Sequence, residues 1–127
     1  VFLNVVDRPK LCSFIVPAIV TRGPVAVAVS TGGASPALAK RLAPELDADL
    51  GDERGAAARI LAALRARLAT ADLAVRARIF TTLADTPLLA ALREHDVTRV
   101  EALLTEHVGI PTTLADLGVD LGAGDHA

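Results

Sequence analysis

Apolar and polar residues alternate in a strand-like pattern up to about residue 33 and in a helix-like pattern after it. Three short apolar runs rich in β-branched residues predict strands at 1–6, 14–20 and 25–29. The first run is apolar on both faces, as in a buried strand of a parallel sheet. The turn signal at 21–24 predicts an antiparallel hairpin of the other two. Pro17 lies within 14–20, so this strand is expected at a sheet edge or with a bulge.

The remaining residues predict helices. Ser35 is an N-cap and Pro36 follows at the first helical position, so a helix is expected from there to about Asp49. Pro44 lies inside it and is expected to kink it or end it early. Gly51 and Asp52 separate the next helix, which carries one apolar stripe. This stripe comprises Ala57, Ile60, Leu61, Leu64 and Leu68.

Three shorter helical segments are expected to follow. The apolar positions of the third helix are Leu73, Ala77, Phe80 and Leu83. Asp85-Thr86-Pro87 is expected to cap a short fourth helix, and Asp96 a fifth that runs to about His107 and stops at Gly109-Ile110-Pro111. Residues 112–127 are rich in Gly and Asp, and we interpret them as a mobile tail. The fold class predicted from the whole pattern is α+β.

The composition limits how the core can be built. Of the 127 residues, 52% are hydrophobic but only 2% are aromatic, and Ala, Leu and Val supply most of the apolar content. Small side chains bury little area each, so such a core needs close helix packing or a partner subunit. Oligomerisation is therefore expected before any motif is considered.

Charge is distributed unevenly along the chain. The net charge is −2, yet residues 51–80 carry six arginines, while residues 81–127 carry two arginines and eight acidic residues. An Arg-rich helical face is most simply a solvated face. Aromatic side chains that would stack on bases are not interleaved with these arginines, so a nucleic-acid partner is not expected.

The single cysteine, Cys12, excludes an internal disulfide, and we expect it to be a small buried hydrophobe. No apolar run has the length of a membrane span, and no signal peptide opens the chain. A cytoplasmic location without membrane contact is therefore expected. The chain starts at Val1 within a strand-like run, which suggests that an upstream portion has been removed.

Two segments carry candidate chemistry. In Asn4-Val5-Val6-Asp7 a strand ends in polar groups, and ligands collect beyond the carboxyl ends of parallel strands. Asp7 is thus either a general acid or base, or a turn cap paired with Arg8 or Lys10. Ser30-Thr31-Gly32-Gly33 leads from a strand into a helix. Its glycines and the helix N-terminus allow an anion site, or simply a tight connection.

The three histidines, His95, His107 and His126, lie near acidic residues but lack zinc-ligand spacing, so no metal site is predicted. Solvated helix ends are the expected positions for them.

Three blocks of the sequence resemble the sirohaem synthase family, and in particular its precorrin-2 dehydrogenase module. They are Asn4-Val5-Val6-Asp7 with Pro9-Lys10, Ser13-Phe14-Ile15-x-Pro17, and Val27-Ala28-Val29-Ser30-Thr31-Gly32-Gly33-x-Ser35-Pro36. Three further segments are similar to the helical region through which the family dimerises: Arg76-x-Arg78-x-Phe80, Leu88-Leu89 and Val100 to Leu104. The resemblance covers about residues 1–108.

The resemblance implies a domain order and an activity. Residues 1–10 would be the last strand of a Rossmann-type NAD-binding domain, 11–50 a strand-helix dimerisation region, 51–108 a helical region and 109–127 a tail. The implied activity is NAD-dependent oxidation of precorrin-2 to sirohydrochlorin in a homodimer, with insertion of ferrous iron as a possible second activity. The glycine-rich NAD turn would lie upstream, so the cofactor-binding residues are unknown and the isolated chain is expected to be inert.

The resemblance also implies roles for single residues. Asp7 would be the catalytic base, and the tetrapyrrole would be bound by Asn4, Lys10, Ser30, Thr31, Gly32 and Gly33. Lys10, Arg8 or some helical arginines would meet its carboxylates. Two alternatives remain open: a dimerisation module that scaffolds without catalysis, and an anion-binding protein unrelated to tetrapyrroles. A G-x-G-x-x-G-like turn upstream would favour the enzyme.

Overall fold

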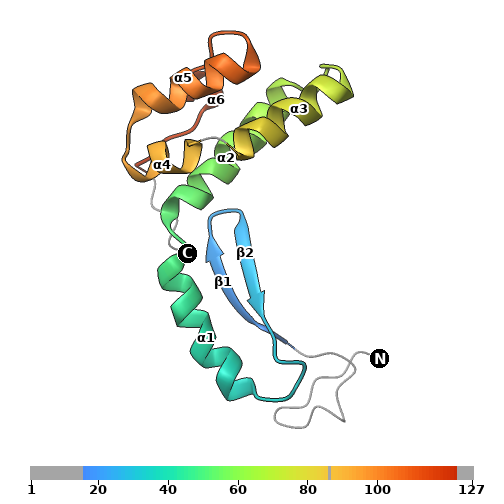
Figure 1. Cartoon of the computed structure of the whole chain (residues 1–127), viewed down its shortest axis with the longest axis vertical. Coiled ribbons are helices and arrows are strands. Elements are labelled where there is room, and N and C mark those ends of the chain that lie inside the picture. Colours follow the sequence, from blue (N-terminus) through green and yellow to red (C-terminus); the bar gives the residue numbers. More distant parts are fainter. Residues whose placement is uncertain (1–15, 86, 123–127) are drawn as a thin grey trace. The chain divides into compact units, whose positions relative to one another are not determined.

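The computed structural model describes residues 16–85 and 87–122 (Figure 1). This part of the chain contains one two-stranded sheet followed by six helices, so the α+β prediction is confirmed. The chain divides into two compact units. The described residues of the first, the hairpin unit, are 16–21 and 26–50; those of the second, the helical unit, are 22–25, 51–85 and 87–122.

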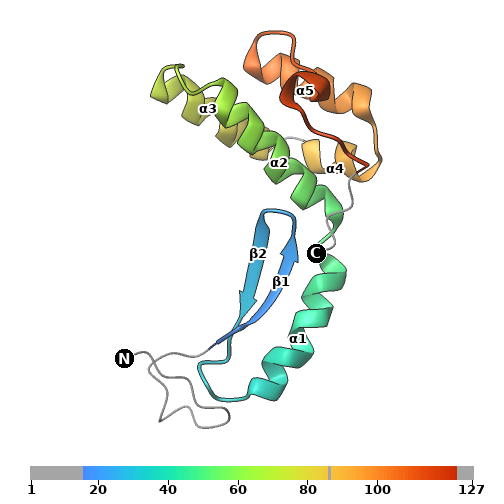
Figure 2. The same ribbon diagram turned by 180° about the vertical axis from the view of Figure 1, so that it is seen from behind.

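The sheet is a hairpin of β1 (Ala18–Arg22) and β2 (Val25–Val29), seen from opposite sides in Figures 1 and 2. Only Gly23 and Pro24 separate the strands, and a link of two residues requires an antiparallel pair. Gly23 has φ 53°, which glycine adopts without steric cost. The predicted strand 25–29 is confirmed.

The other predicted strand, 14–20, is shifted in the structure. β1 begins at Ala18 and continues to Arg22, because a turn of only two residues lets the strand extend through Thr21 and Arg22. Pro17 precedes the strand, and within the described residues β1 lies at a sheet edge, as expected, because the sheet has two strands. Residues 14 and 15, like the predicted strand 1–6, lie outside the described residues.

Helix α1 (Pro36–Asp49) has the predicted bounds. Its N-cap is Ser35, whose Oγ accepts a hydrogen bond from the Leu38 amide at 3.2 Å. The expected early end at Pro44 is wrong, because the helix continues through it. Proline removes one backbone donor, but the leucines, alanines and glutamate around it are good helix formers.

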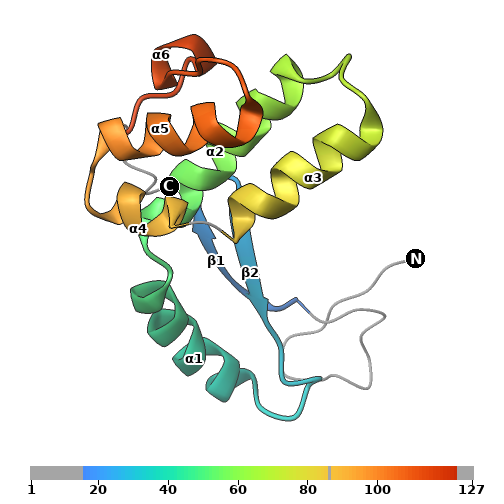
Figure 3. The same cartoon turned by 45° about the horizontal axis from the view of Figure 1, so that its top comes forward.

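The helical unit contains α2 (Asp52–Arg67), α3 (Leu73–Ala84), α4 (Leu88–Arg93), α5 (Val97–Val108) and α6 (Leu114–Leu117), shown in Figure 3. Helix α2 packs against α4 and α6, and α5 packs against α3 and α4. The predicted start of α2 after Gly51 is confirmed, as is the Asp96 cap of α5, where the carboxylate accepts from the Arg99 amide at 3.0 Å. Gly109 ends α5 with φ 83°.

The core of the helical unit is aliphatic. The predicted stripe of α2 is confirmed, since Ala57, Ile60 and Leu64 are buried and Leu61 and Leu68 pack against them. The core residues are Ala56, Ala57, Ile60, Leu64, Ile79, Leu83, Leu88, Ala91, Leu92, Val100, Leu104 and Leu114. Within the described residues, the helices are too short or too polar to cross a bilayer.

Only some of the apolar positions named for the third helix are buried in α3. Leu83 is buried and Phe80 is half-buried, but Leu73 is 70% exposed and Ala77 is exposed. Ile79 is buried in their place. A helix of this composition offers two overlapping apolar faces about one residue apart, and contact with α5 selects the face through Ile79 and Leu83.

The predicted Asp85-Thr86-Pro87 cap is also corrected. Asp85 is the C-cap of α3, with its amide bonded to the carbonyls of Thr82 and Leu83, and Pro87 is the N-cap of α4 without a side-chain hydrogen bond. Asp85 retains helical backbone angles (φ −93°, ψ 0°), so it extends the preceding helix. Thr86 lies outside the described residues.

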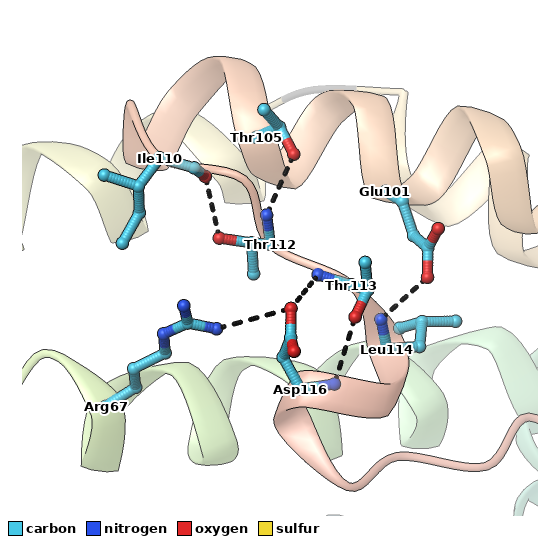
Figure 4. A network of polar contacts seen from close by, with 8 residues as sticks. All are labelled: Arg67, Glu101, Thr105, Ile110, Thr112, Thr113, Leu114 and Asp116. Carbon is cyan, nitrogen blue, oxygen red and sulfur yellow. Dashed lines mark hydrogen bonds and ion pairs between the residues drawn. The ribbon is translucent and has the colours of Figure 1, made fainter.

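The expected mobile tail is wrong for residues 112–122. Thr112 is only 1% exposed and Leu114, the first residue of α6, is a core residue (Figure 4). The Thr112 amide donates to Thr105 Oγ1 at 3.1 Å, and the Leu114 amide to Glu101 Oε1 at 2.8 Å. Side chains of α5 thus provide acceptors for backbone donors that a tail would leave to water. Residues 123–127 lie outside the described residues.

Candidate functional site

The predicted ligand-binding segment Ser30–Gly33 is the connection between β2 and α1. Gly32 and Gly33 have φ values of 62° and 84°, in the left-handed region that side chains with a Cβ rarely adopt. Two consecutive residues of this kind turn the chain sharply out of the strand. Ser30 and Gly32 are exposed, and Thr31 and Gly33 are half-buried.

The two hydroxyl groups of this segment are hydrogen-bonded to its own backbone. Ser30 Oγ accepts from the Gly32 amide at 3.2 Å, and Thr31 Oγ1 accepts from the Ser35 amide at 3.0 Å. The Ala34 amide donates to the Thr31 carbonyl at 3.1 Å. Each hydroxyl keeps its O–H proton, which can be donated to an acceptor such as a carboxylate. The turn can therefore offer hydroxyl donors to an anion while its amides hold its shape.

The start of α1 completes this connection. The amides of Leu38 and Ala39 donate to the Ser35 carbonyl at 3.1 and 3.2 Å, so backbone donors of the first turn have partners within the helix. The first turn of α1 carries no acidic residue. The helix dipole therefore favours negative charge near Ser35 without competition from a neighbouring carboxylate.

The structure brings four of the predicted site residues together, namely Ser30, Thr31, Gly32 and Gly33, because they are consecutive. The other three, Asn4, Asp7 and Lys10, lie outside the described residues, and so does Cys12. Their predicted roles as catalytic base, substrate ligands and buried hydrophobe stay predictions.

A charged cluster in the helical unit was not predicted. Glu53, in the first turn of α2, has a side chain that is only 6% exposed. Its Oε1 accepts from Arg54 Nη1 and from Arg93 Nη2, both at 2.8 Å. Burial acts to raise the pKa of Glu53, but hydrogen bonds from Arg93 and from its own backbone amide, with the charges of both arginines, hold this pKa below its ordinary value.

The cluster also explains a glycine. A Cβ at Gly51 would collide with the carboxylate oxygens of Glu53 and lie 2.6 Å from its Cδ. The carboxylate therefore folds back over the N-cap of α2, where the helix dipole favours a negative charge. Acidic residues in the first turn are a visible sequence signal, but nothing in the sequence connects Glu53 to Arg93 forty positions later.

Several of the helical arginines, some of which were expected to meet substrate carboxylates, have partners inside the helical unit. Arg54 and Arg93 bind Glu53, and Arg67 lies 3.8 Å from Asp116. The Arg65 guanidinium stacks 4.8 Å from the centroid of the Phe80 ring, and Arg76 donates to the Ala69 carbonyl at 3.3 Å. Apart from the contact of Arg54 with its neighbour Glu53, these contacts join helices and loops of the unit, so these five arginines have structural partners.

The two described histidines lie at helix ends, as predicted. His95 is exposed between α4 and α5 with φ 55°, and His107 is half-buried in the last turn of α5. His126 lies outside the described residues. Within 16–85 and 87–122, no three His, Cys, Asp or Glu side chains are grouped as metal ligands would be.

Part of the chain is similar to known proteins of sirohaem biosynthesis. Residues 22–43, which contain β2 and the Ser30–Gly33 turn, match the family model described as "Sirohaem biosynthesis protein central". A siroheme synthase of Methylococcus capsulatus is 51% identical over 76 residues, which is 60% of this chain and 16% of that protein. Siroheme synthases of an Enterobacter species and of Salmonella paratyphi B are 51% and 50% identical over 70 and 68 residues, or 55% and 54% of this chain.

The chain spans about a sixth of the length of these relatives, since the aligned parts cover 15–16% of them. Identity near one half over some 70 residues lies far above chance resemblance, and the family model falls on the turn whose geometry is described above. Over its matched part, the chain is therefore similar to siroheme synthases and to the central part of sirohaem biosynthesis proteins.

Proposed function

We propose that this chain is part of an enzyme of sirohaem biosynthesis, a precorrin-2 dehydrogenase that oxidises precorrin-2 to sirohydrochlorin with NAD. Its relatives are siroheme synthases, which supports a role in the same pathway. The dehydrogenase step rests on the resemblance of the Asn4–Lys10 and Ser30–Pro36 blocks to the precorrin-2 dehydrogenase module. We also propose that the isolated chain does not catalyse this oxidation by itself.

The observation that carries the proposal is the β2–turn–α1 connection. It lies inside the matched segment 22–43 and offers two hydroxyl groups beside a helix N-terminus that carries no acid. Precorrin-2 bears many carboxylates, and hydroxyl donors next to a positive helix end suit such groups. In the proposal, Ser30 and Thr31 donate to one substrate carboxylate, while the glycines let the macrocycle approach the backbone.

Asp7 is the proposed base. It would take a proton from the macrocycle as the hydride leaves, with Asn4 and Lys10 orienting the substrate through its polar groups. A carboxylate serves in this way when its surroundings tune its pKa to the working pH. This assignment comes from the resemblance of the surrounding block alone.

The described residues do not fit a dinucleotide. A nucleotide-binding unit needs an open parallel sheet and a glycine turn whose amides face the pyrophosphate. Residues 16–85 and 87–122 provide a two-stranded hairpin, and the Gly32 amide is bonded to Ser30 Oγ. In the proposal, NAD is therefore bound by other parts of a longer protein.

The proposal also includes a homodimer assembled through the hairpin unit. Among the described residues of this unit only Val20 and Ala39 are buried, whereas Val16 and Ile19 are 59% and 60% exposed and Leu38 is 48% exposed. A lone two-stranded hairpin is marginally stable in water. A second copy that covered these side chains would supply the missing apolar burial.

The dimer is tested by sedimentation of two matched variants. Ile19→Lys places a charge on the exposed face of β1 and is expected to shift the chain to monomer. Ala115→Lys places the same charge at an exposed position of α6, outside the segments that resemble the family's dimerising region, and is expected to leave the dimer unchanged. A monomeric unmodified chain, or a dimer that survives Ile19→Lys, contradicts this part of the proposal.

The reaction is tested in the longer protein with an assay of NAD-dependent precorrin-2 oxidation. Asp7→Ala is expected to abolish turnover, whereas Glu106→Ala, which removes an exposed carboxylate of α5, is expected to leave it unchanged. NAD-dependent turnover by the isolated chain, or an active Asp7→Ala protein, would overturn the assignment. A longer protein that forms the dimer but has no turnover would favour the scaffold alternative.

Insertion of ferrous iron into sirohydrochlorin is tested separately with the same longer protein and its variants. Removal of the pyrrole protons again needs a base, and the metal is a substrate that requires no resident site. An anaerobic assay with sirohydrochlorin and ferrous iron, without NAD, separates this activity from dehydrogenation. If Asp7 serves both steps, Asp7→Ala is expected to lose both activities together.

A further inference from the structure

We draw no further inference here: the strongest candidate, the exposed apolar face of α3 that carries Leu73, Ala74 and Ala77, is a surface for which nothing in the described part of the chain shows what covers it.

Discussion

Glu53 at the start of α2 and Arg93 at the end of α4 are joined by a hydrogen-bonded ion pair, with 2.8 Å between Oε1 and Nη2. The Glu53 side chain is 6% exposed and that of Arg93 is 63% exposed, so a buried carboxylate meets a guanidinium that reaches in from solvent. The pair joins two helices whose apolar faces form one core, and it makes the helical unit sensitive to changes at either residue.

Replacement of Arg93 by Ala is expected to destabilise the helical unit by about 1–3 kcal/mol, because a buried carboxylate loses one of its two charged donors. Arg54 remains bound to the same oxygen, which keeps the loss below that of a fully orphaned charge. Urea unfolding followed by circular dichroism measures the change. Arg78→Ala, at an exposed position of α3, is the matched control. An Arg93→Ala chain as stable as the control would contradict a stabilising role for the pair.

The same pair predicts how stability depends on pH. The folded pKa of Glu53 lies below its ordinary value of 4.5, so its stabilising contribution is complete above that pH. It is lost as the pH falls through the folded pKa. Hydrogen bonds from the backbone and side chain of Thr113 lower the pKa of Asp116 as well. Its titration therefore changes the stability of the folded chain in the same direction.

Glu53→Gln is therefore expected to flatten the acid side of the stability curve without abolishing it. The measurement is the unfolding midpoint between about pH 7 and about pH 3, a range that covers the titration of carboxylates. The unmodified chain is expected to lose more stability on acidification than the variant. Parallel curves for the two proteins would show that Glu53 does not titrate with folding.

Gly51→Ala is expected to weaken the ion pair of Glu53 with Arg93, although Gly51 itself carries no charge. The added Cβ would collide with the Glu53 carboxylate, whose flexible side chain must then move away from Arg93. The backbone at Gly51 (φ −67°) suits alanine, so the effect comes from the displaced side chain and a poorer N-cap. In a Glu53→Ala background, where nothing is left to displace, the cost of Gly51→Ala is expected to shrink. Equal costs in both backgrounds would contradict this mechanism.

Leu114→Ala tests whether residues 112–122 are part of the core. Leu114 is 6% exposed and belongs to the apolar cluster, so its truncation is expected to cost about 2–5 kcal/mol. Leu73→Ala removes the same atoms from a side chain that is 70% exposed, and is expected to change stability by no more than about 0.5 kcal/mol. Thermal unfolding of the two variants gives the comparison. Similar melting temperatures for the two variants would show that residues 112–122 do not contribute to the core.

Gly32→Ala tests the geometry of the candidate turn. No atom lies within 4 Å of a Cβ at this position, so the expected cost, about 1–2 kcal/mol, comes from φ 62° alone. Asn tolerates the left-handed region better than Ala, so Gly32→Asn is expected to be milder. Hydrogen exchange of the Ala34 and Ser35 amides, which donate to Thr31, reports the turn directly. Faster exchange of these amides in the Gly32→Asn variant than in the Gly32→Ala variant would contradict the left-handed backbone conformation as the cause of the destabilisation.

Much of the fold could be predicted from the sequence because it depends on interactions between residues that are close together in the chain. Ser35 and Asp96 mark helix starts because each side chain caps an amide only three residues away. The apolar stripe of α2 and the strand 25–29 were also predictable. The stripe repeats with the helical period because one face of the helix is buried, and the strand is one short run of strand-forming residues. The Ser30–Gly33 turn belongs to the same class, because its hydrogen bonds close within five residues.

The tertiary structure alone decided which apolar face of α3 is buried and where the last residues pack. Leu73 and Ile79 are equally apolar in the sequence, and only the position of α5 separates them. Residues 112–122 are ordered because Glu101 and Thr105 present acceptors from another helix, and Glu53 is buried because Arg93 reaches it from forty residues away. Sequence patterns report interactions over a few residues, whereas these positions depend on partners that only the folded chain brings within hydrogen-bonding or van der Waals distance.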